Sequence, residues 1–182
     1  MSELEKIEII RIKKTDINFK NIEWIIKAKS CDKSRFVLTH ICVNKQEIVA
    51  TDGRRMHIIK DTCGLDEGLY SVLLKNKSNI LLEKSKESDE FPKYKAVYPI
   101  EPHKKINARY TDRIEYVLFD LFESFKNCVS IDYLKDAFNY PYFTWDKICC
   151  REKDTQLSPI LFKSEEREAI VMPLKIDINE RN

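Results

Sequence analysis

Glycine is scarce in this sequence, with only three residues among 182. A glycine-rich loop that cradles phosphates is therefore absent, as are the H-E-x-x-H and G-x-S-x-G motifs of common hydrolases. The three histidines, His40, His57 and His103, have no recognisable partner residues. We expect no enzymatic activity. An enzymatic alternative would require folding to bring His57, Asp52 and a cysteine into one pocket.

Long apolar runs are also missing. None reaches the roughly 18–20 residues needed to cross a bilayer, and the first ten residues mix acidic with basic side chains. The composition, 43% hydrophobic and 34% charged, is typical of a chain that folds in water. We expect a cytoplasmic protein with neither a membrane span nor a secretory leader.

The six cysteines include no C-x-x-C pair, which argues against a zinc site. Adjacent Cys149 and Cys150 would face opposite sides of a strand. We interpret most of the cysteines as small buried hydrophobes that stay reduced, and we expect neither metal nor cofactor.

The net charge is only +2, so bulk electrostatics give no reason to expect nucleic acid binding. Any contact with DNA would have to come from a local basic patch.

Periodicity predicts strands and helices in an α+β order. The apolar spacing in residues 111–127 and 130–139 is typical of helices, and Pro141 ends the second. Residues 75–88 are compatible with a short helix or an edge strand, and the proline-rich 91–102 predicts extended chain. The other predictions are a strand at 6–13, a helix at 22–29, a hairpin over 35–53 with His40 half-buried in a strand, strands from 54 and 68, and a three-stranded antiparallel ending.

Three short segments carry a family resemblance. Residues 50–56, A-T-D-G-R-R-M, resemble the A-T-D-G-H-R-L segment of the bacterial DNA sliding clamp, the DNA polymerase III β subunit. Residues 91–99, F-P-K-Y-K-A-V-Y-P, resemble its F-P-D-Y-x-x-V-x-P segment, and residues 171–176, V-M-P-L-K-I, resemble its carboxyl-terminal V-M-P-M-R-L. Residues 130–139 resemble the helix before that terminus, and Ser158-Pro159 falls where the family often has the same pair. The resemblance implies a DNA-clamp-like fold of antiparallel sheets backed by helices.

In the family these segments converge on a hydrophobic pocket that binds short linear peptides of polymerases and other replication and repair proteins. Two plainer interpretations stay open: residues 50–56 form an ordinary strand and turn, and Val171 and Met172 fill the core. Carried over by residue, the implied peptide-binding pocket comprises Thr51, Gly53, Arg54, Arg55, Met56, Pro99, Ser158, Val171, Met172, Pro173 and Leu174.

The chain is short for this family, whose members have three clamp domains and close a six-domain ring as dimers. We expect a single clamp-like domain over 1–182 with an insertion near 75–127. The alternative is a trimmed two-part arrangement, 1–99 and 100–182. A ring of six domains would need about six copies of a one-domain chain, or about three copies of a two-part chain.

The leading hypothesis is a clamp-like DNA replication accessory, a processivity factor that binds clamp-interaction peptides. It would bind double-stranded DNA as an oligomer through helix lysines, for which the candidates are Lys20, Lys27, Lys29 and Lys135. These lysines are equally compatible with a solvated helix face. The alternative function is a monomeric, clamp-derived protein-binding module or regulator that does not encircle DNA.

Overall fold

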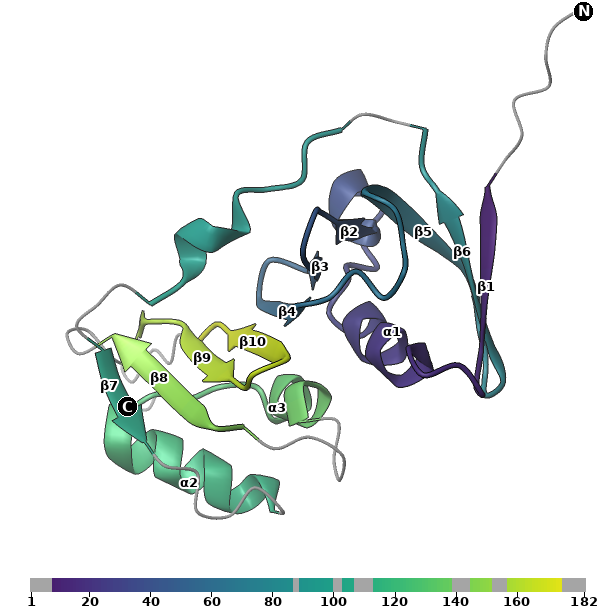
Figure 1. Cartoon of the computed structure of the whole chain (residues 1–182). Coiled ribbons are helices and arrows are strands. Elements are labelled where there is room, and N and C mark those ends of the chain that lie inside the picture. Colours follow the sequence, from purple (N-terminus) through teal and green to yellow (C-terminus); the bar gives the residue numbers. More distant parts are fainter. Residues whose placement is uncertain are drawn as a thin grey trace, which may run out of the picture. The chain divides into compact units, whose positions relative to one another are not determined.

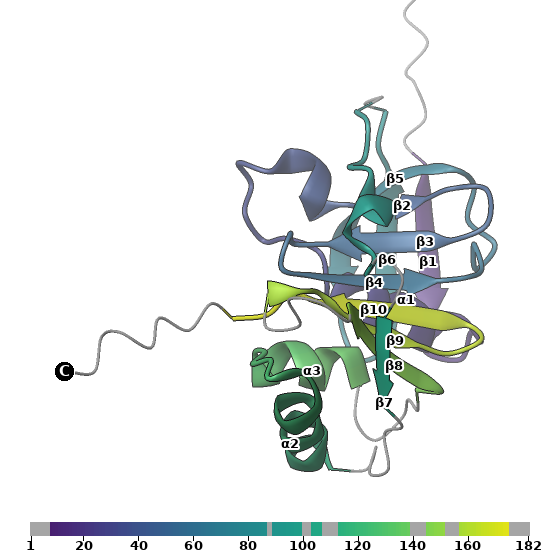
Figure 2. The same cartoon turned by 90° about the vertical axis from the view of Figure 1, so that its left-hand side faces the viewer.

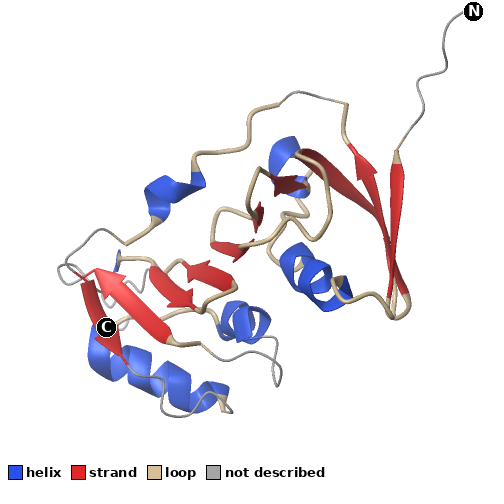
Figure 3. Ribbon diagram, viewed as in Figure 1, coloured by secondary structure: helices blue, strands red, loops and turns tan. Residues whose placement is uncertain are grey.

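The computed structural model describes residues 8–86, 89–99, 103–106, 113–138, 145–151 and 157–174. The chain folds into two units, whose course is shown in Figure 1 and whose helices and strands are marked in Figure 3. Unit 1 comprises Met1–Gly53 and Ile58–Pro92, and unit 2 comprises Arg54–His57 and Lys93–Asn182. Strand β4 (Arg55–Ile59) therefore contributes residues to both units. The predicted domain count stays a prediction.

Unit 1 is an antiparallel sheet with one α-helix. Its strand order is β1-β6-β5-β2-β3, and the register places Ile10 opposite Leu82 and Ile12 opposite Ile80. Its elements are β1 (Ile9–Lys13), α1 (Phe19–Ile26), the 3-10 helix η1 (Phe36–Thr39), β2 (Ile41–Val43), β3 (Ile48–Thr51), β5 (Gly68–Lys75) and β6 (Asn79–Lys84).

Helix α1 forms the core of unit 1 together with the sheet. Ile22, Trp24 and Ile25 are fully buried, and the helix contacts β3. The apolar residues recur at the helical period, which explains why this segment is a helix rather than a strand. The predicted helix is confirmed, although it begins three residues earlier than expected.

Two predictions for short segments were wrong. Residues 36–39 form η1 instead of a strand. His40, which follows η1, is buried and lies outside a strand, where we predicted a half-buried strand residue, and its Nδ1 lies 3.0 Å from the Phe36 carbonyl oxygen. Residues 94–97 form the 3-10 helix η2 instead of extended chain. A single turn of 3-10 helix is too short to show a hydrophobic period, so the sequence pattern could not reveal it. For residues 75–88 the structure contains strand β6 instead of a helix, but the predicted edge position was wrong, because β6 pairs with both β1 and β5.

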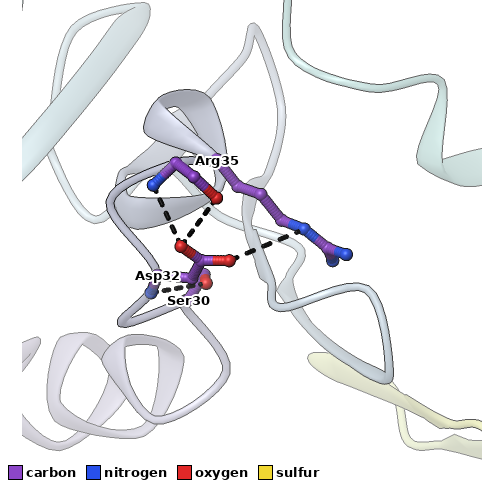
Figure 4. A network of polar contacts seen from close by, with 4 residues as sticks. Ser30, Asp32 and Arg35 are labelled. Carbon is purple, nitrogen blue, oxygen red and sulfur yellow. Dashed lines mark hydrogen bonds and ion pairs between the residues drawn. The ribbon is translucent and has the colours of Figure 1, made fainter.

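The loop that precedes η1 is held by hydrogen bonds around Asp32 (Figure 4). The Asp32 Oδ1 accepts hydrogen bonds from the Ser34 hydroxyl at 2.7 Å and the Ser34 amide at 2.9 Å, and both lower the pKa of Asp32. Arg35 lies 3.9 Å from the same carboxylate. A Cβ atom at Gly53 would lie 3.2 Å from the Arg35 Nη1, and Gly53 has φ +87°, so a side chain there would be strained.

Tyr70 makes the stability of unit 1 depend on alkaline pH. Its ring is fully buried and its hydroxyl donates to the Asp66 carbonyl oxygen at 2.8 Å. Burial, with nearby Glu8 and Asp66, raises the pKa of Tyr70 from 10.0 to about 12. The unfolded chain therefore loses this proton first, so the contribution is fully present below pH 10 and is lost as pH rises toward 12.

We expect the free energy of unfolding to fall by up to about 1.4 kcal/mol per pH unit in this window because of Tyr70 alone. Urea titrations at several pH values, followed by the emission of Trp24 in a Trp145→Phe background, measure this slope. The Tyr70→Phe variant should show a shallower slope, whatever its stability at neutral pH. An unchanged slope would show that Tyr70 does not titrate in this range.

Unit 2 is an antiparallel sheet backed by two helices. The strand order is β10-β9-β8-β7, with residues 55–57 of β4 beside β10. Both helices lie on one side of the sheet, where α2 contacts β7 and α3 contacts β10 (Figure 2). The elements are η2 (Tyr94–Val97), β7 (His103–Ile106), α2 (Ile114–Phe125), α3 (Ile131–Phe138), β8 (Lys147–Arg151), β9 (Ile160–Lys163) and β10 (Arg167–Val171).

An aromatic cluster fills the core of unit 2. The ring of Phe138 packs edge-on against Phe162 at 5.5 Å between centroids, and Trp145 lies 6.0 Å from Phe162 and 6.2 Å from Phe138. All three side chains are buried. Their contacts tie α3 to β8 and β9, because Phe138 ends the helix and Trp145 precedes β8.

The cysteines are all free, and their environments differ. Cys149 and Cys150 are buried in β8, Cys31 is exposed, and the others are half-buried. Burial raises the pKa of Cys150 to about 11, which keeps this thiol protonated at neutral pH. The interpretation of most cysteines as buried hydrophobes therefore holds only for the pair in β8, since three others are half-buried and Cys31 is exposed.

The α+β prediction of helix-backed antiparallel sheets is confirmed. The predicted helices near 111–127 and 130–139 correspond to α2 and α3, and the predicted three-stranded ending to β8, β9 and β10. Strand β7 was not predicted. Residues 111 and 112, at the start of the first of these predicted helices, lie outside the described residues, as do Lys175 and Ile176 of the carboxyl-terminal motif. Among the described helices, none has the length and apolar character that crossing a bilayer requires.

Candidate functional site

A pocket of about 340 Å³ lies within unit 2. Three separate parts of the sequence form it: the residue before β4, the start of α3, and the segment that follows β10. The volume is at the lower end of the range typical of ligand pockets, about 300–1,000 Å³. Its lining residues are Arg54, Ser130, Tyr133, Met172, Pro173 and Leu174.

Backbone hydrogen bonds fix the segment after β10 on both sides. The Met172 amide donates to the Arg54 carbonyl oxygen at 2.8 Å, and the Leu174 amide donates to the Cys128 carbonyl oxygen at 2.7 Å. Pro173, between them, has no N–H to satisfy and restricts its own φ. This wall of the pocket is therefore held in one conformation before any ligand binds.

Arg55 contacts two residues of α3, one of which lines the pocket. Its guanidinium forms an ion pair with Asp136 of α3, and its Cζ lies 4.6 Å from the centre of the Tyr133 ring. Both partners of the ion pair are largely shielded, with side-chain exposures of 14% and 32%. A charged, hydrogen-bonded pair combined with a cation–π contact orients Tyr133 toward one rotamer.

The pocket combines apolar walls with polar groups. Met172, Pro173, Leu174 and the Tyr133 ring provide apolar surface, and methionine adapts to irregular side chains. The Arg54 guanidinium and the Ser130 hydroxyl can bond to a peptide backbone. Such a site suits one or two apolar side chains of an extended peptide, with polar groups that set its direction.

The structure brings together part of the predicted pocket. Arg54, Met172, Pro173 and Leu174 line it, and Arg55 supports it from behind Tyr133. Ser130 and Tyr133 line the pocket but were not among the predicted site residues. The helical pattern predicted for residues 130–139 places Tyr133 on α3, but it does not indicate that this side chain faces the pocket.

Other predicted site residues are buried or half-buried and do not line the pocket. Met56 and Val171 are buried in the core, at 2% and 0% exposure. Ser158 is buried, and its carbonyl oxygen accepts a hydrogen bond from Asn127 Nδ2 at 3.1 Å. Pro99 is half-buried after Tyr98, whose hydroxyl bonds to Glu168. A direct role in binding stays a prediction for these residues.

Thr51 and Gly53 belong to unit 1. The Thr51 hydroxyl accepts a hydrogen bond from the Gly53 amide at 3.1 Å, which closes the turn after β3. This turn agrees with the plainer interpretation of the motif as a strand and turn, and a role in peptide binding stays a prediction.

The four candidate lysines are divided between the units. Lys20 and Lys27 lie on or next to α1, with Lys29 just beyond, in unit 1, and Lys135 lies on α3 in unit 2. Lys20 and Lys135 are exposed, whereas Lys27 and Lys29 are half-buried. Binding of DNA by these lysines stays a prediction.

His57 and Asp52, which the enzymatic alternative requires in one pocket, belong to different units. His57 is fully buried in β4 within unit 2, whereas Asp52 belongs to unit 1. In the part of the chain that the structure describes, no group of three or more histidine, cysteine or acidic residues could hold a metal ion. These observations add no support to the enzymatic alternative.

No protein-family model matches the sequence, and no curated protein matches it. Solved structures of bacterial DNA polymerase III β subunits do match. The Borrelia burgdorferi subunit, in complex with a natural product, gives a TM-score of 0.57 at 13% identity, over 97% of this chain and 66% of that protein. The Thermotoga maritima subunit gives 0.59 at 14% identity, over 96% and 69%. The Helicobacter pylori β clamp bound to a DNA ligase peptide gives 0.55 at 11% identity, over 97% and 68%.

The match therefore extends over nearly the whole of this chain, which spans about two thirds of the length of these clamps. Identity at this level supports the fold and not a shared activity. The chain has the fold of the bacterial DNA polymerase III β sliding clamps, and the predicted resemblance to that family is confirmed at the level of the fold.

Proposed function

We propose that this protein binds short linear peptides in the pocket of unit 2, as a clamp-like accessory of DNA replication. The observation that carries the proposal is the convergence of three distant sequence segments on one small pocket that is lined by apolar and polar side chains. The Helicobacter pylori clamp of similar fold was solved with a DNA ligase peptide, which supports this kind of partner. Catalysis has no part in the proposal.

The chemistry of the pocket favours a peptide with leucine or phenylalanine anchors. Such side chains fit between Met172 and the Tyr133 ring, where methionine can adjust to either shape. The Arg54 guanidinium donates hydrogen bonds only, so it would bond to carbonyl or carboxylate oxygens of the peptide. The bonds at Met172 and Leu174 leave the pocket preformed, which reduces the entropy cost of binding.

Fluorescence anisotropy with a labelled DNA ligase peptide tests this proposal. We expect saturable binding of the peptide to the full chain. The Met172→Ala variant should bind it with an affinity at least about tenfold lower, because one apolar wall of the pocket is lost. The combined Arg55→Ala and Met172→Ala variant should lose more. Leu157→Ala removes an exposed apolar side chain of unit 2 outside the pocket lining and should bind like the unmodified protein.

If both pocket variants bind the peptide as tightly as the unmodified chain, the pocket is not the binding site. If the unmodified chain does not bind, this peptide class is not its partner. Circular dichroism of each variant keeps loss of binding distinct from loss of fold.

Two versions of the replication role remain proposals. In one, the chain assembles around double-stranded DNA and retains it through Lys20, Lys27, Lys29 and Lys135. In the other, it acts alone on proteins as a regulator. Retention of duplex DNA that decreases with salt favours the first, because phosphate contacts release counterions. Light scattering of the full chain separates a ring of about three or six copies from a smaller species that cannot form a ring.

A further inference from the structure

Helix α2 is apolar on two sides. Its buried side packs inside unit 2 through Ile114, Val117, Leu121 and Phe125. The other side carries Tyr116, Phe119 and Phe122, exposed by 44%, 57% and 52%. These three residues, the aromatic stripe, are three positions apart and therefore lie on one face. Single exposed apolar residues are ordinary, but three rings along one helix are typical of a surface that another protein covers.

Charged residues frame the aromatic stripe in an ordered way. The Arg113 Cζ lies 5.7 Å from the Tyr116 ring centre, and the Lys126 Nζ lies 5.6 Å from the Phe122 ring centre. The helical repeat places exposed Glu123 on the Tyr116 side of Phe119, and exposed Glu115 on the Phe122 side. The Tyr116 side thus carries Arg113 and Glu123 at opposite ends of the helix, with half-buried Asp120 between them, and the Phe122 side carries Glu115 and Lys126 at opposite ends.

We infer that the aromatic stripe is covered by α2 of a second copy of this chain, in an antiparallel pair related by a two-fold axis beside Phe119. This axis places each side of the stripe against the same side of the partner's stripe. It also places the N-terminal end of one helix beside the C-terminal end of the other. Arg113 of one copy then meets Glu123 of its partner, and Glu115 meets Lys126, while the two Phe119 rings meet at the centre. All four charged residues gain an opposite charge in one arrangement.

Other occupants satisfy these residues less well. Glu115, Asp120 and Glu123 lie on α2, so the helix would repel the phosphates of nucleic acid. If a partner carried charges of only one sign, two of the four charged residues that frame the stripe would have the same sign as the partner. A parallel pair would also bring opposite charges together, but it would place both helix N-termini side by side, which the helix dipoles disfavour. The inference concerns self-association and does not depend on peptide binding by the pocket.

Sedimentation velocity of the full chain over a wide concentration range tests the pair. We expect a reversible monomer–dimer equilibrium, and a dimer dissociation constant raised at least about tenfold by Phe119→Ser, because each dimer loses two central rings. Leu157→Ser alters an equally exposed apolar residue outside α2 and should leave the equilibrium unchanged. A chain that stays monomeric, or whose dimer survives Phe119→Ser, would overturn the inference, as would a trimer or hexamer.

Charge reversal tests the antiparallel arrangement. Arg113→Glu and Glu123→Arg should each weaken the dimer, and the double variant should restore it, because both symmetric contacts are re-formed with reversed sign. In a parallel pair Arg113 would instead face Glu115 of the partner, so the double variant would bring two carboxylates together there and be weaker still. Failure of the double variant to recover association would therefore overturn the antiparallel pair. Measuring peptide affinity for Phe119→Ser in parallel keeps this result separate, since an intact pocket should bind as before.

Discussion

Replacing Phe162 with alanine is expected to lower the free energy of unfolding of unit 2 by about 3–5 kcal/mol. Phe162 is fully buried in β9 and its ring contacts those of Phe138 and Trp145. The substitution removes a large apolar side chain and leaves a cavity where three elements meet, and the neighbouring rings are too large to collapse into it fully.

The chain offers a direct measurement of this effect. It has two tryptophans, Trp24 in unit 1 and Trp145 in unit 2, both buried. In a Trp24→Phe background, emission during urea unfolding reports Trp145 alone, and so reports unit 2. Phe122→Ala is the matched control, since it deletes the same side chain from an exposed site in the same unit and should cost well under about 1 kcal/mol.

A loss at Phe162 no larger than the loss at Phe122 would show that the aromatic cluster does not hold unit 2 together. The titrations are best run at low protein concentration, so that association through α2 does not add to the stability of either variant.

Replacing Asp136 with alanine should lower the free energy of unfolding of unit 2 by about 1–3 kcal/mol. The change removes the carboxylate that forms an ion pair with Arg55 in a largely shielded position. The guanidinium would keep its desolvation cost and lose a charged partner, which is the expensive half of breaking such a pair. The same urea titration followed by Trp145 measures the loss.

A double variant separates charge from packing. Arg55→Leu together with Asp136→Leu replaces the ion pair with apolar side chains and should recover much of the stability lost in Asp136→Ala. Peptide affinity should fall in this double variant, because Tyr133 would lack the cation above its ring. If the double variant were less stable than Asp136→Ala, the pair would be a net source of stability rather than a device that orients the pocket wall.

The sequence predicted the long elements well because they repeat a pattern. In α2 the buried Val117, Leu121 and Phe125 recur at the helical period over three turns. Strand β7 was missed, because His103–Ile106 ends in its only apolar residue and shows no alternation. The helices η1 and η2 span four residues each and contain too few positions to express a period.

The pocket was predictable only in part, for a related reason. Short motifs pointed to Arg54, Met172 and Pro173, but a motif does not say which of its side chains faces the pocket. Val171 is in β10 and entirely buried, whereas Met172 is outside the strand and half-buried. The orientation of Tyr133 in the pocket depends on the contact between Arg55 and Asp136. These two residues are distant from each other in the sequence, and no local pattern indicates that they meet.

The division of β4 has a consequence for how the protein is made. Unit 2 takes Arg54–His57 from a stretch of chain that otherwise builds unit 1, and Met172 must find Arg54 across most of the sequence. Arg54 is therefore synthesised long before Met172. Contacts between residues so far apart in the sequence form slowly during folding. If the pocket binds peptides as proposed, a nascent chain would bind none there until residue 174 has been synthesised.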